Sequence, residues 1–272
     1  MTALVSVEAV SKTFGARRSE KRAVDGVSFT IARGETFGIV GESGSGKSTL
    51  GRMVLGLTRP DSGVVRFEGT DLSALSSSHM RRLRGRIQVV FQDPHTSLNR
   101  RQSVRRIIEA PLRAHGRGTA QERRRQAESL LELVRLPSAM ADRSPSELSG
   151  GQAQRVAIAR ALALSPSFVV LDEAVSALDT SVRASVLNLL TDLQADLGLT
   201  YLFISHDLSV IRQTCHRVAV MKQGAFVEEA SSAALFSAPQ HPYTRELLAA
   251  VPSIRPRAAV REPRRFPDVP EL

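Results

Sequence analysis

Residues 41–48 read Gly41-Glu42-Ser43-Gly44-Ser45-Gly46-Lys47-Ser48 and match the pattern G-x-x-x-x-G-K-[S/T] at every fixed position. We expect an apolar strand, Glu35–Val40, before this stretch and a helix, Lys47–Leu57, after it. Glycines let the backbone curve around phosphates so that successive N–H groups point inward, and the start of the helix adds positive potential. The segment therefore predicts a phosphate-binding loop made of Gly41, Glu42, Ser43, Gly44, Ser45, Gly46, Lys47, Ser48 and Thr49.

Two side chains of this loop indicate the class of its ligand. Lys47 would reach the β- and γ-phosphates of a nucleoside triphosphate as a point charge, and the hydroxyl of Ser48 would coordinate Mg²⁺. Kinases, GTPases and many ATPases share the pattern. By itself, the loop predicts a nucleoside triphosphate with Mg²⁺ and leaves the reaction open.

Two carboxylates follow another apolar strand, Phe168–Leu171. In an open parallel sheet, ligands bind beyond the carboxyl ends of the strands, which is also where the phosphate-binding loop is expected. Asp172 would hold Mg²⁺ directly or through water, and Glu173 would polarise the attacking water as a general base. The pair therefore favours attack of water on the bound nucleotide.

The order of the expected elements predicts the fold class. Helices and strands alternate in the second half of the chain, which indicates a parallel sheet with crossover helices: Gln152–Leu164, Phe168–Leu171, Ser181–Leu197 and Thr200–Ile204. Short strands are expected at Leu4–Val10, Ala23–Ile31, Val64–Phe67 and Ile87–Phe91. Residues 92–149 read as Arg-rich helices, one of which begins with a capping box at Thr119. After Phe236 we expect one short helix and a Pro- and Arg-rich tail.

Composition excludes several classes of protein. With 42% hydrophobic and 24% charged residues, the chain of 272 residues can form a sizeable core. The single cysteine, Cys215, excludes an internal disulfide, a four-cysteine zinc site and a self-contained iron–sulfur cluster. Aromatic residues are scarce, at 4%, which disfavours base stacking on single-stranded nucleic acid. Because we find neither a signal peptide nor an apolar run of about 18 residues, we expect a soluble chain in a reducing cytoplasm.

Positive charge is concentrated in one stretch. Residues 79–125 contain 13 arginines, no lysine and three acidic residues. The formal charge of this stretch is therefore +10, as large as the net charge of the whole chain. Such a stretch suggests nucleic acid, an anionic membrane surface or an acidic partner, and a merely solvated face is an equally open alternative.

A second glycine-rich helix start, Leu148-Ser149-Gly150-Gly151-Gln152, gives the chain another potential phosphate-binding site. Here the sequence resembles the ATP-binding-cassette (ABC) ATPases, whose diagnostic sequence is LSGGQ. The resemblance covers nearly the whole chain, with its motifs in the family order. It implies that Phe14 stacks on adenine, that Gln92 contacts nucleotide and Mg²⁺, and that His206 is the switch histidine at the γ-phosphate. It also implies a D-loop at residues 176–179 and nucleotide contacts from Ser149, Gly150, Gly151 and Gln152.

The resemblance further implies an architecture. We expect an α/β fold: a P-loop NTPase (RecA-like) core with a parallel sheet, a small antiparallel β subdomain and an inserted helical subdomain at about 93–164. The ATP-binding domain would span 1–235, and a C-terminal extension would span 236–272. Two subunits would bind two ATP molecules head to tail, with Lys47 and Glu173 of one facing Ser149 and Gly151 of the other. Ala174 and Ala153 depart from residues frequent in the family, and we expect them to tune activity rather than abolish it.

Three stretches resemble one importer branch, the oligopeptide/dipeptide/nickel transporters. They are Phe91-Gln92-Asp93-Pro94 with Ser97-Leu98-Asn99, then residues 174–179, and His241-Pro242-Tyr243-Thr244-Arg245 followed by 247–252; Arg100 replaces the usual proline. This implies the ATP-hydrolysing subunit of a dipeptide or oligopeptide importer at the cytoplasmic face of the inner membrane. Its partners would be a second ABC ATPase subunit, identical or different, two transmembrane permease subunits and, indirectly, an extracytoplasmic solute-binding protein. The basic stretch would then lie near acidic coupling loops or the anionic leaflet, through Arg81, Arg82, Arg100, Arg101, Arg105 and Arg106.

Other functions remain as alternatives. An importer of nickel or another solute would share every motif. A non-transport ABC ATPase acting on nucleic acid or ribosomes would suit the basic stretch, but the sequence has no long coiled-coil insertion and no second cassette, so no nucleic acid is expected. An exporter or lipid-transporting ATPase is disfavoured by the motif at His241.

Overall fold

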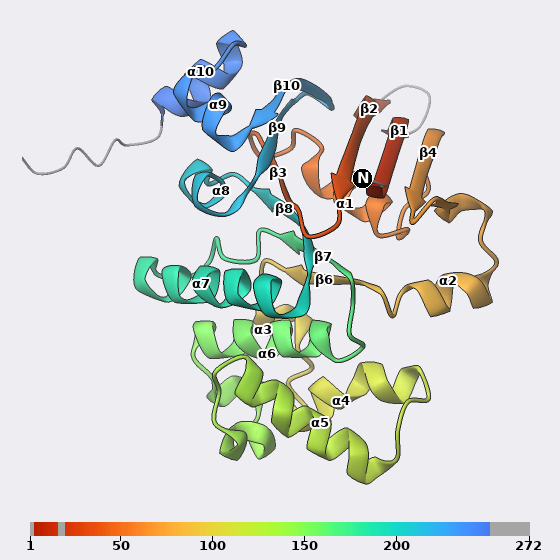
Figure 1. Ribbon diagram of the computed structural model, residues 1–272, viewed down its shortest axis with the longest axis vertical. Helices are drawn as coiled ribbons and strands as arrows, with labels where there is room; N and C mark the ends of the chain where they lie inside the picture. Colours follow the sequence, from red (N-terminus) through yellow and green to blue (C-terminus); the bar gives the residue numbers. More distant parts are fainter. Residues whose placement is uncertain (1–2, 16–19, 251–272) are drawn as a thin grey trace, which may run out of the picture.

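Two sheets and a group of helices form the structure, a computed structural model that describes residues 3–15 and 20–250 (Figure 1). The strands are β1 (Ala3–Phe14), β2 (Lys21–Ala32), β3 (Thr36–Val40), β4 (Ser62–Phe67), β5 (Thr70–Asp71), β6 (Ile87–Phe91), β7 (Phe168–Asp172), β8 (Thr200–Ser205), β9 (Arg217–Lys222) and β10 (Ala225–Ser231). The helices are α1 (Lys47–Val54), α2 (Ser77–Leu83), α3 (Pro94–Ser97), α4 (Val104–Ala114), α5 (Ala120–Leu133), α6 (Gly150–Leu162), α7 (Thr180–Leu197), α8 (Leu208–Thr214), α9 (Ser232–Ser237) and α10 (Pro242–Ala249). The expected tail, with Val251 and Pro252, lies outside the described residues.

The larger sheet has six strands in the order β10-β9-β3-β8-β7-β6. All neighbours in it run parallel except β9 and β10. Its register places Val40 beside Ser205, and Asp172 beside both Ile204 and Phe91. The loops that follow β3, β8, β7 and β6 therefore leave from one edge of the sheet, where ligands bind in folds of this kind.

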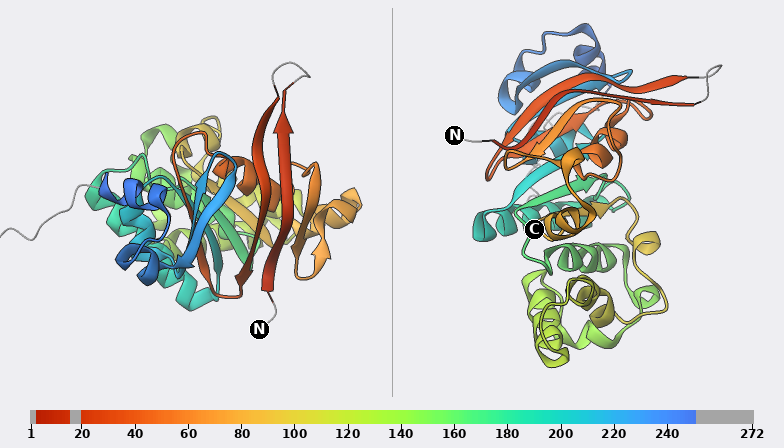
Figure 2. Two further views of the ribbon diagram at one scale, coloured as in Figure 1. Left: turned by 90° about the horizontal axis from the view of Figure 1, so that it is seen from above. Right: turned by 90° about the vertical axis from the view of Figure 1, so that its right-hand side faces the viewer.

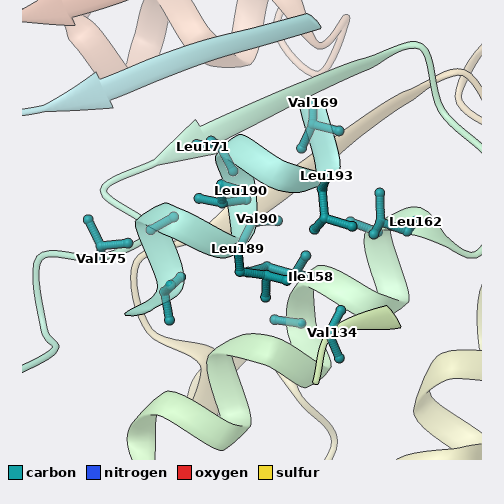
Figure 3. Packing of buried hydrophobic residues seen from close by; sticks show 14 of the residues in the cluster. Val90, Val134, Ile158, Leu162, Val169, Leu171, Val175, Leu189, Leu190 and Leu193 are labelled. Atoms are coloured by element: carbon teal, nitrogen blue, oxygen red, sulfur yellow. The ribbon is translucent and has the colours of Figure 1, made fainter. Parts of the chain in front are cut away.

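Both faces of this sheet are covered, which explains why its strands are apolar throughout. In β7, Phe168 and Val170 face one hydrophobic cluster while Val169 and Leu171 face the other. The first cluster also contains α1 and the four-stranded sheet. The second contains α7 and the helices beneath it, and Figure 3 shows side chains of β7, α7 and α6 packed together there.

The smaller sheet is antiparallel, with strand order β2-β1-β4-β5. It stands beside the parallel sheet, and α4, α5 and α6 lie at the end of the molecule opposite to α9 and α10 (Figure 2). A parallel sheet, an antiparallel sheet and a helical group are thus all present, as the sequence predicts. In the part of the chain that the structure describes, no helix combines the length and apolarity needed to cross a bilayer.

Several arginines of the basic stretch serve the helical group itself. Arg81 donates to the carbonyl of Ala114 at the end of α4, and Arg117 donates to the carbonyl of Leu164 just after α6, at 3.0 Å. Arg105 forms an ion pair with Asp142 at 2.6 Å. Cations at helix C-termini satisfy free carbonyls and oppose the negative end of the helix dipole. The side chains of the other arginines named above make no hydrogen bond or ion pair with any described residue: Arg82, Arg100, Arg101 and Arg106.

Some element boundaries differ from the expectations. The helix expected over Lys47–Leu57 ends at Val54, because Gly56 at φ +64° lets the N–H of Leu57 donate to the carbonyl of Arg52 at 2.9 Å. Helix α6 begins at Gly150, two residues earlier than expected, because Ser149 caps it. The capping box at Thr119 is confirmed. The sequence analysis did not expect the elements α2, α8, α9, β5, β9 and β10.

Candidate active site

The loop of residues 41–48 connects β3 to α1 and packs tightly against two other strands. A Cβ atom at Gly41 would lie 2.1 Å from the carbonyl oxygen of Met221 in β9, and one at Gly46 would lie 2.1 Å from the carbonyl oxygen of Ala23 in β2. Only glycine fits such close approaches. The loop is further tied to the turn after β9, where Gly224 N–H donates to the carbonyl of Ser45 at 2.9 Å.

Lys47 lies inside the curve of this loop and is 5% exposed. Its ammonium donates to the carbonyl oxygens of Gly41 and Glu42, each at 2.7 Å. Burial lowers the pKa of Lys47 below its usual value, and the charges of Glu173, Asp172 and Glu42 oppose this effect. A partly dehydrated ammonium surrounded by oxygen atoms is well placed to bind phosphate oxygens.

Ser48 and Asp172 meet at the carboxyl edge of the sheet. The Ser48 hydroxyl donates to Oδ1 of Asp172 at 3.1 Å. Burial raises the pKa of Asp172 above its usual value; the Ser48 hydrogen bond opposes this, and the charge of Glu173 adds to it. Mg²⁺ prefers oxygen ligands at about 2.1 Å in an octahedron, whose neighbouring corners are roughly 3 Å apart. The two oxygen atoms therefore fit a shared Mg²⁺.

Glu173 has an unusual backbone conformation for a residue that is not glycine, with φ +52°. This conformation costs about 1–2 kcal/mol and is held by its N–H, which donates to the carbonyl of Ile204 at 2.9 Å. It brings Oε2 of Glu173 to 2.9 Å from Nδ1 of His206, the residue after β8. The side chain of Glu173 is 18% exposed and that of His206 is 55% exposed. A sheltered carboxylate with an open imidazole beside it suits activation of a water molecule.

A cavity of about 270 Å³ joins these elements. Glu173 lines this cavity. So do six residues that the sequence predicts to bind nucleotide: Ser43, Gly44, Gly46, Lys47, Ser48 and Thr49. Two lining residues, Lys21 and Ala23, were missed by the sequence analysis. The pairing of β1 with β2 places Phe14 opposite Lys21, and Phe14 itself is 47% exposed and outside the lining. The position of Lys21 at the cavity follows from the register of β2 against β1, which could not be predicted from the sequence.

Two sets of residues that the sequence predicts to contact nucleotide lie away from this cavity. Gln92 follows β6 and is exposed, and among described residues no hydrogen bond joins it to Ser48 or Asp172. Residues 149–152 begin α6 and do not line the cavity. There the hydroxyl of Ser149 accepts from the N–H of Gln152 at 3.3 Å, and Oε1 of Gln152 accepts from the N–H of Ser149 at 3.0 Å. The hydrogen atom of the exposed Ser149 hydroxyl remains available to an outside acceptor.

Arg183, which the sequence analysis also missed, links the segment after Glu173 to the segment after β8. Its guanidinium donates to Oδ2 of Asp207 at 2.6 Å and to the carbonyl of Leu178 at 3.0 Å. In the same segment, the hydroxyl of Ser176 donates to the carbonyl of Glu173 at 2.9 Å. These contacts fix residues 176–179 relative to His206.

Comparison with family models gives two matches. Residues 24–176 match the model described as ABC transporter. Residues 227–271 match the model described as oligopeptide/dipeptide transporter, C-terminal region.

Comparison with curated proteins gives relatives over most of the chain. A protein of Brucella ovis named as a peptide import ATP-binding protein is 51% identical over 257 residues, which cover 94% of this chain and 81% of the relative. The oligopeptide transport ATP-binding protein AppF of Bacillus subtilis is 49% identical over 255 residues, which cover 93% of this chain and 78% of AppF.

Solved structures resemble the fold closely. The ATP-binding cassette MJ0796, in a dimeric post-hydrolysis state bound to ADP and phosphate, has a TM-score of 0.76 at 32% identity, over 84% of this chain and 98% of MJ0796. The protein cbiO1 of Clostridium perfringens, part of the transporter complex cbiONQ, has a TM-score of 0.78 at 28% identity, over 93% of this chain and 97% of cbiO1. These neighbours confirm the fold class expected from the sequence.

Proposed function

We propose that this chain, which belongs to the ABC transporter family, is the ATP-hydrolysing subunit of an importer for oligopeptides or dipeptides. Membership rests on the match over 24–176 and on relatives at about 50% identity, and it confirms the resemblance inferred from the motifs. The chain is accordingly a nucleotide-binding ATPase. The observation that carries peptide import is the match of residues 227–271 to the oligopeptide/dipeptide C-terminal region, supported by relatives named for peptide import.

The proposed chemistry divides among the side chains of the cavity. Lys47 binds the β- and γ-phosphates of ATP, and Ser48 with Asp172 holds Mg²⁺, a role supported by their 3.1 Å contact. Mg²⁺ would neutralise charge on the phosphate oxygens. Glu173 accepts a proton from the attacking water, and His206 orients both the carboxylate and the γ-phosphate, a role supported by their 2.9 Å contact.

The remaining nucleotide contacts are assigned to a second subunit. Ser149, Gly150, Gly151 and Gln152 lie at the start of α6, away from the cavity. Ser149 and Gly150 are exposed there, which suits contact with ATP held by a partner. The dimeric state described for MJ0796 supports this arrangement. Phe14 would stack on adenine, and Gln92 would join the Mg²⁺ site once nucleotide is bound.

The proposal also includes assembly and location. An ATP-binding domain at 1–235, with helical subdomain 93–164, and an extension at 236–272 would work at the cytoplasmic face of the inner membrane. ATP binding would dimerise this chain with a second ABC ATPase subunit and change the conformation of two permease subunits. An extracytoplasmic solute-binding protein would deliver the solute to the permease. Four exposed arginines, whose side chains bond to no residue in the described part of the chain, would face acidic permease loops or the anionic leaflet: Arg82, Arg100, Arg101 and Arg106.

Purification of the full chain from membranes tests this function. We expect two multispanning permease subunits and a second ATPase to co-purify, and the ATPase rate of the complex to fall when Ser149 is replaced by Ala. The control is Thr119→Ala, which removes the same kind of capping box from the start of α5. Hydrolysis at full rate by an isolated monomer, unchanged by Ser149→Ala, would contradict the two-subunit site. Co-purification of the chain with ribosomes or nucleic acid, and with no permease subunit, would contradict import.

A further inference from the structure

Tyr243 connects the C-terminal helix α10 to the phosphate-binding loop. It lies in the first turn of α10 and is 3% exposed. Its hydroxyl accepts a hydrogen bond from the backbone N–H of Glu42 at 3.3 Å. Figure 1 shows α10 at the β10 end of the six-stranded sheet. Tyr243 thus reaches the expected phosphate-binding loop although it lies 201 positions from Glu42 in sequence.

The aromatic ring of Tyr243 is fixed by a second contact. The ammonium of Lys222 lies 4.2 Å from the ring centroid, close enough for a cation–π interaction. Lys222 ends β9 and directly follows Met221, the residue whose carbonyl oxygen excludes a side chain at Gly41. The end of β9, the start of the loop and Tyr243 therefore pack as one group.

The start of α10 is held independently of the Tyr243 hydroxyl. The carboxylate of Glu228 in β10 accepts hydrogen bonds from the N–H groups of Gln240 and His241, each at 2.9 Å. His241 then caps the helix, since its Nδ1 accepts from the N–H of Tyr243 at 3.2 Å. Removal of the hydroxyl alone should therefore leave α10 in place.

The hydrogen bond acts on the same peptide group that Lys47 contacts. The carbonyl of Gly41 and the N–H of Glu42 belong to one planar unit and point in opposite directions. Lys47 donates to the carbonyl side at 2.7 Å, while Tyr243 accepts from the N–H side. Burial raises the pKa of the Tyr243 hydroxyl, which keeps it neutral at physiological pH.

We propose that Tyr243 is a positioning residue of the nucleotide site: its hydroxyl holds the Gly41–Glu42 peptide plane, which sets the position of Lys47 and hence the affinity for nucleotide phosphates. Tyr243 touches no substrate atom and acts through the loop. The inference deepens the proposed function, because it requires that the loop bind nucleotide. It makes the C-terminal helix part of the ATPase site.

Nucleotide affinity of matched tyrosine variants tests the proposal. The chain has two tyrosines, and the hydroxyl of the other, Tyr201, donates to the carbonyl of Leu190 at 3.1 Å in the core. We expect Tyr243→Phe to raise the Kd for ADP by about three- to tenfold, the value of one hydrogen bond, with little change in Tm. Tyr201→Phe should lower Tm and leave that Kd unchanged. A Kd for Tyr243→Phe within twofold of the wild type overturns the proposal, whereas a wild type that binds no ADP overturns the nucleotide site itself.

Tyrosine fluorescence provides a readout that a purely structural role would not change. The sequence contains no tryptophan, so Tyr243 is the only long-wavelength fluorophore of the Tyr201→Phe variant. We expect ADP to change the emission intensity relative to adenosine at equal concentration, which absorbs the same light, and the change should have the half-saturation found by calorimetry. An intensity that ADP does not alter overturns the proposal.

Discussion

Oε2 of Glu173 lies 2.9 Å from Nδ1 of His206, although the two residues follow different strands, β7 and β8. Glu173 reaches this position through a left-handed backbone at φ +52°, and β7 and β8 lie side by side with Asp172 opposite Ile204. The contact aligns a carboxylate with an imidazole. Such alignment is what general-base catalysis of water attack requires.

Replacement of Glu173 by Gln should separate binding from hydrolysis. Glutamine keeps the size of the side chain and a hydrogen bond to His206 but cannot accept a proton. We expect ATP affinity close to that of the wild type and a turnover lower by about 10²–10³-fold. Steady-state phosphate release and ATP binding by calorimetry measure the two quantities. Glu132→Gln, on the exposed face of α5, is the control, and near-normal turnover of the Glu173 variant would remove this residue from the role.

Asp172→Asn should stabilise the chain while it weakens Mg²⁺-dependent binding. Burial raises the pKa of Asp172, so at neutral pH the folded chain bears the cost of a buried charge. Between its usual pKa and the raised one, the folded state binds more protons than the unfolded state, and stability without nucleotide therefore rises as pH falls. We expect the Asn variant to melt about 1–3 °C higher at pH 8 and this difference to shrink toward pH 4.

The same titration should affect metal binding in the opposite direction. A proton on Asp172 competes with Mg²⁺, so Mg²⁺-dependent ADP affinity of the wild type should fall as pH decreases toward the usual aspartate pKa. The Asn variant should bind ADP weakly, with little dependence on Mg²⁺ or on pH in this range. Calorimetric titrations with and without Mg²⁺ at several pH values measure this, and equal Mg²⁺ dependence in both proteins would contradict the assigned ligand.

What the sequence predicts correctly is local or periodic. The strand, loop and helix around residues 41–48 form one continuous segment, and apolar runs such as β7 indicate a sheet covered on both faces. The contacts of Lys21, Arg183 and Tyr243 could not be predicted in this way. Each depends on strand register or on packing between segments far apart in sequence, and the residue type alone, a lysine, an arginine or a tyrosine, is equally common on a solvated surface.

Arg183→Lys should impair turnover more than binding. Lys keeps the charge but has a single nitrogen, whereas the guanidinium uses two separate nitrogens to bond Asp207 at 2.6 Å and the carbonyl of Leu178 at 3.0 Å. Because these contacts fix the segment after Glu173, we expect kcat to fall several-fold with little change in KM, and stability to fall by about 1–2 kcal/mol.

Arg135→Lys is the matched control for this change. Arg135 pairs with Asp192 at 2.5 Å, but both side chains are about half exposed, at 56% and 51%. Exposed pairs contribute roughly 0–1 kcal/mol, so this variant should be near neutral in stability and kinetics. Equal effects of the two substitutions would show that Arg183 has no special link to the site.

Gly151→Ala should force α6 and α7 apart at the start of the LSGGQ helix. A Cβ at Gly151 would lie 2.4 Å from Cγ1 of Val182, whereas one at Gly150 would meet only Leu178 at 3.7 Å, an ordinary contact. We expect Gly151→Ala to lower stability by about 1–3 kcal/mol and Gly150→Ala to be neutral or slightly stabilising. Chemical denaturation measures both.

A second substitution identifies the cause. Val182→Ala removes Cγ1, and the next nearest atom, Cβ of Val182, is 3.7 Å from the added methyl group. In that background Gly151→Ala should cost far less, so the double-mutant cycle should give a favourable coupling of at least 1 kcal/mol. If the two destabilisations simply add, overpacking against Val182 is not the reason for glycine at this position.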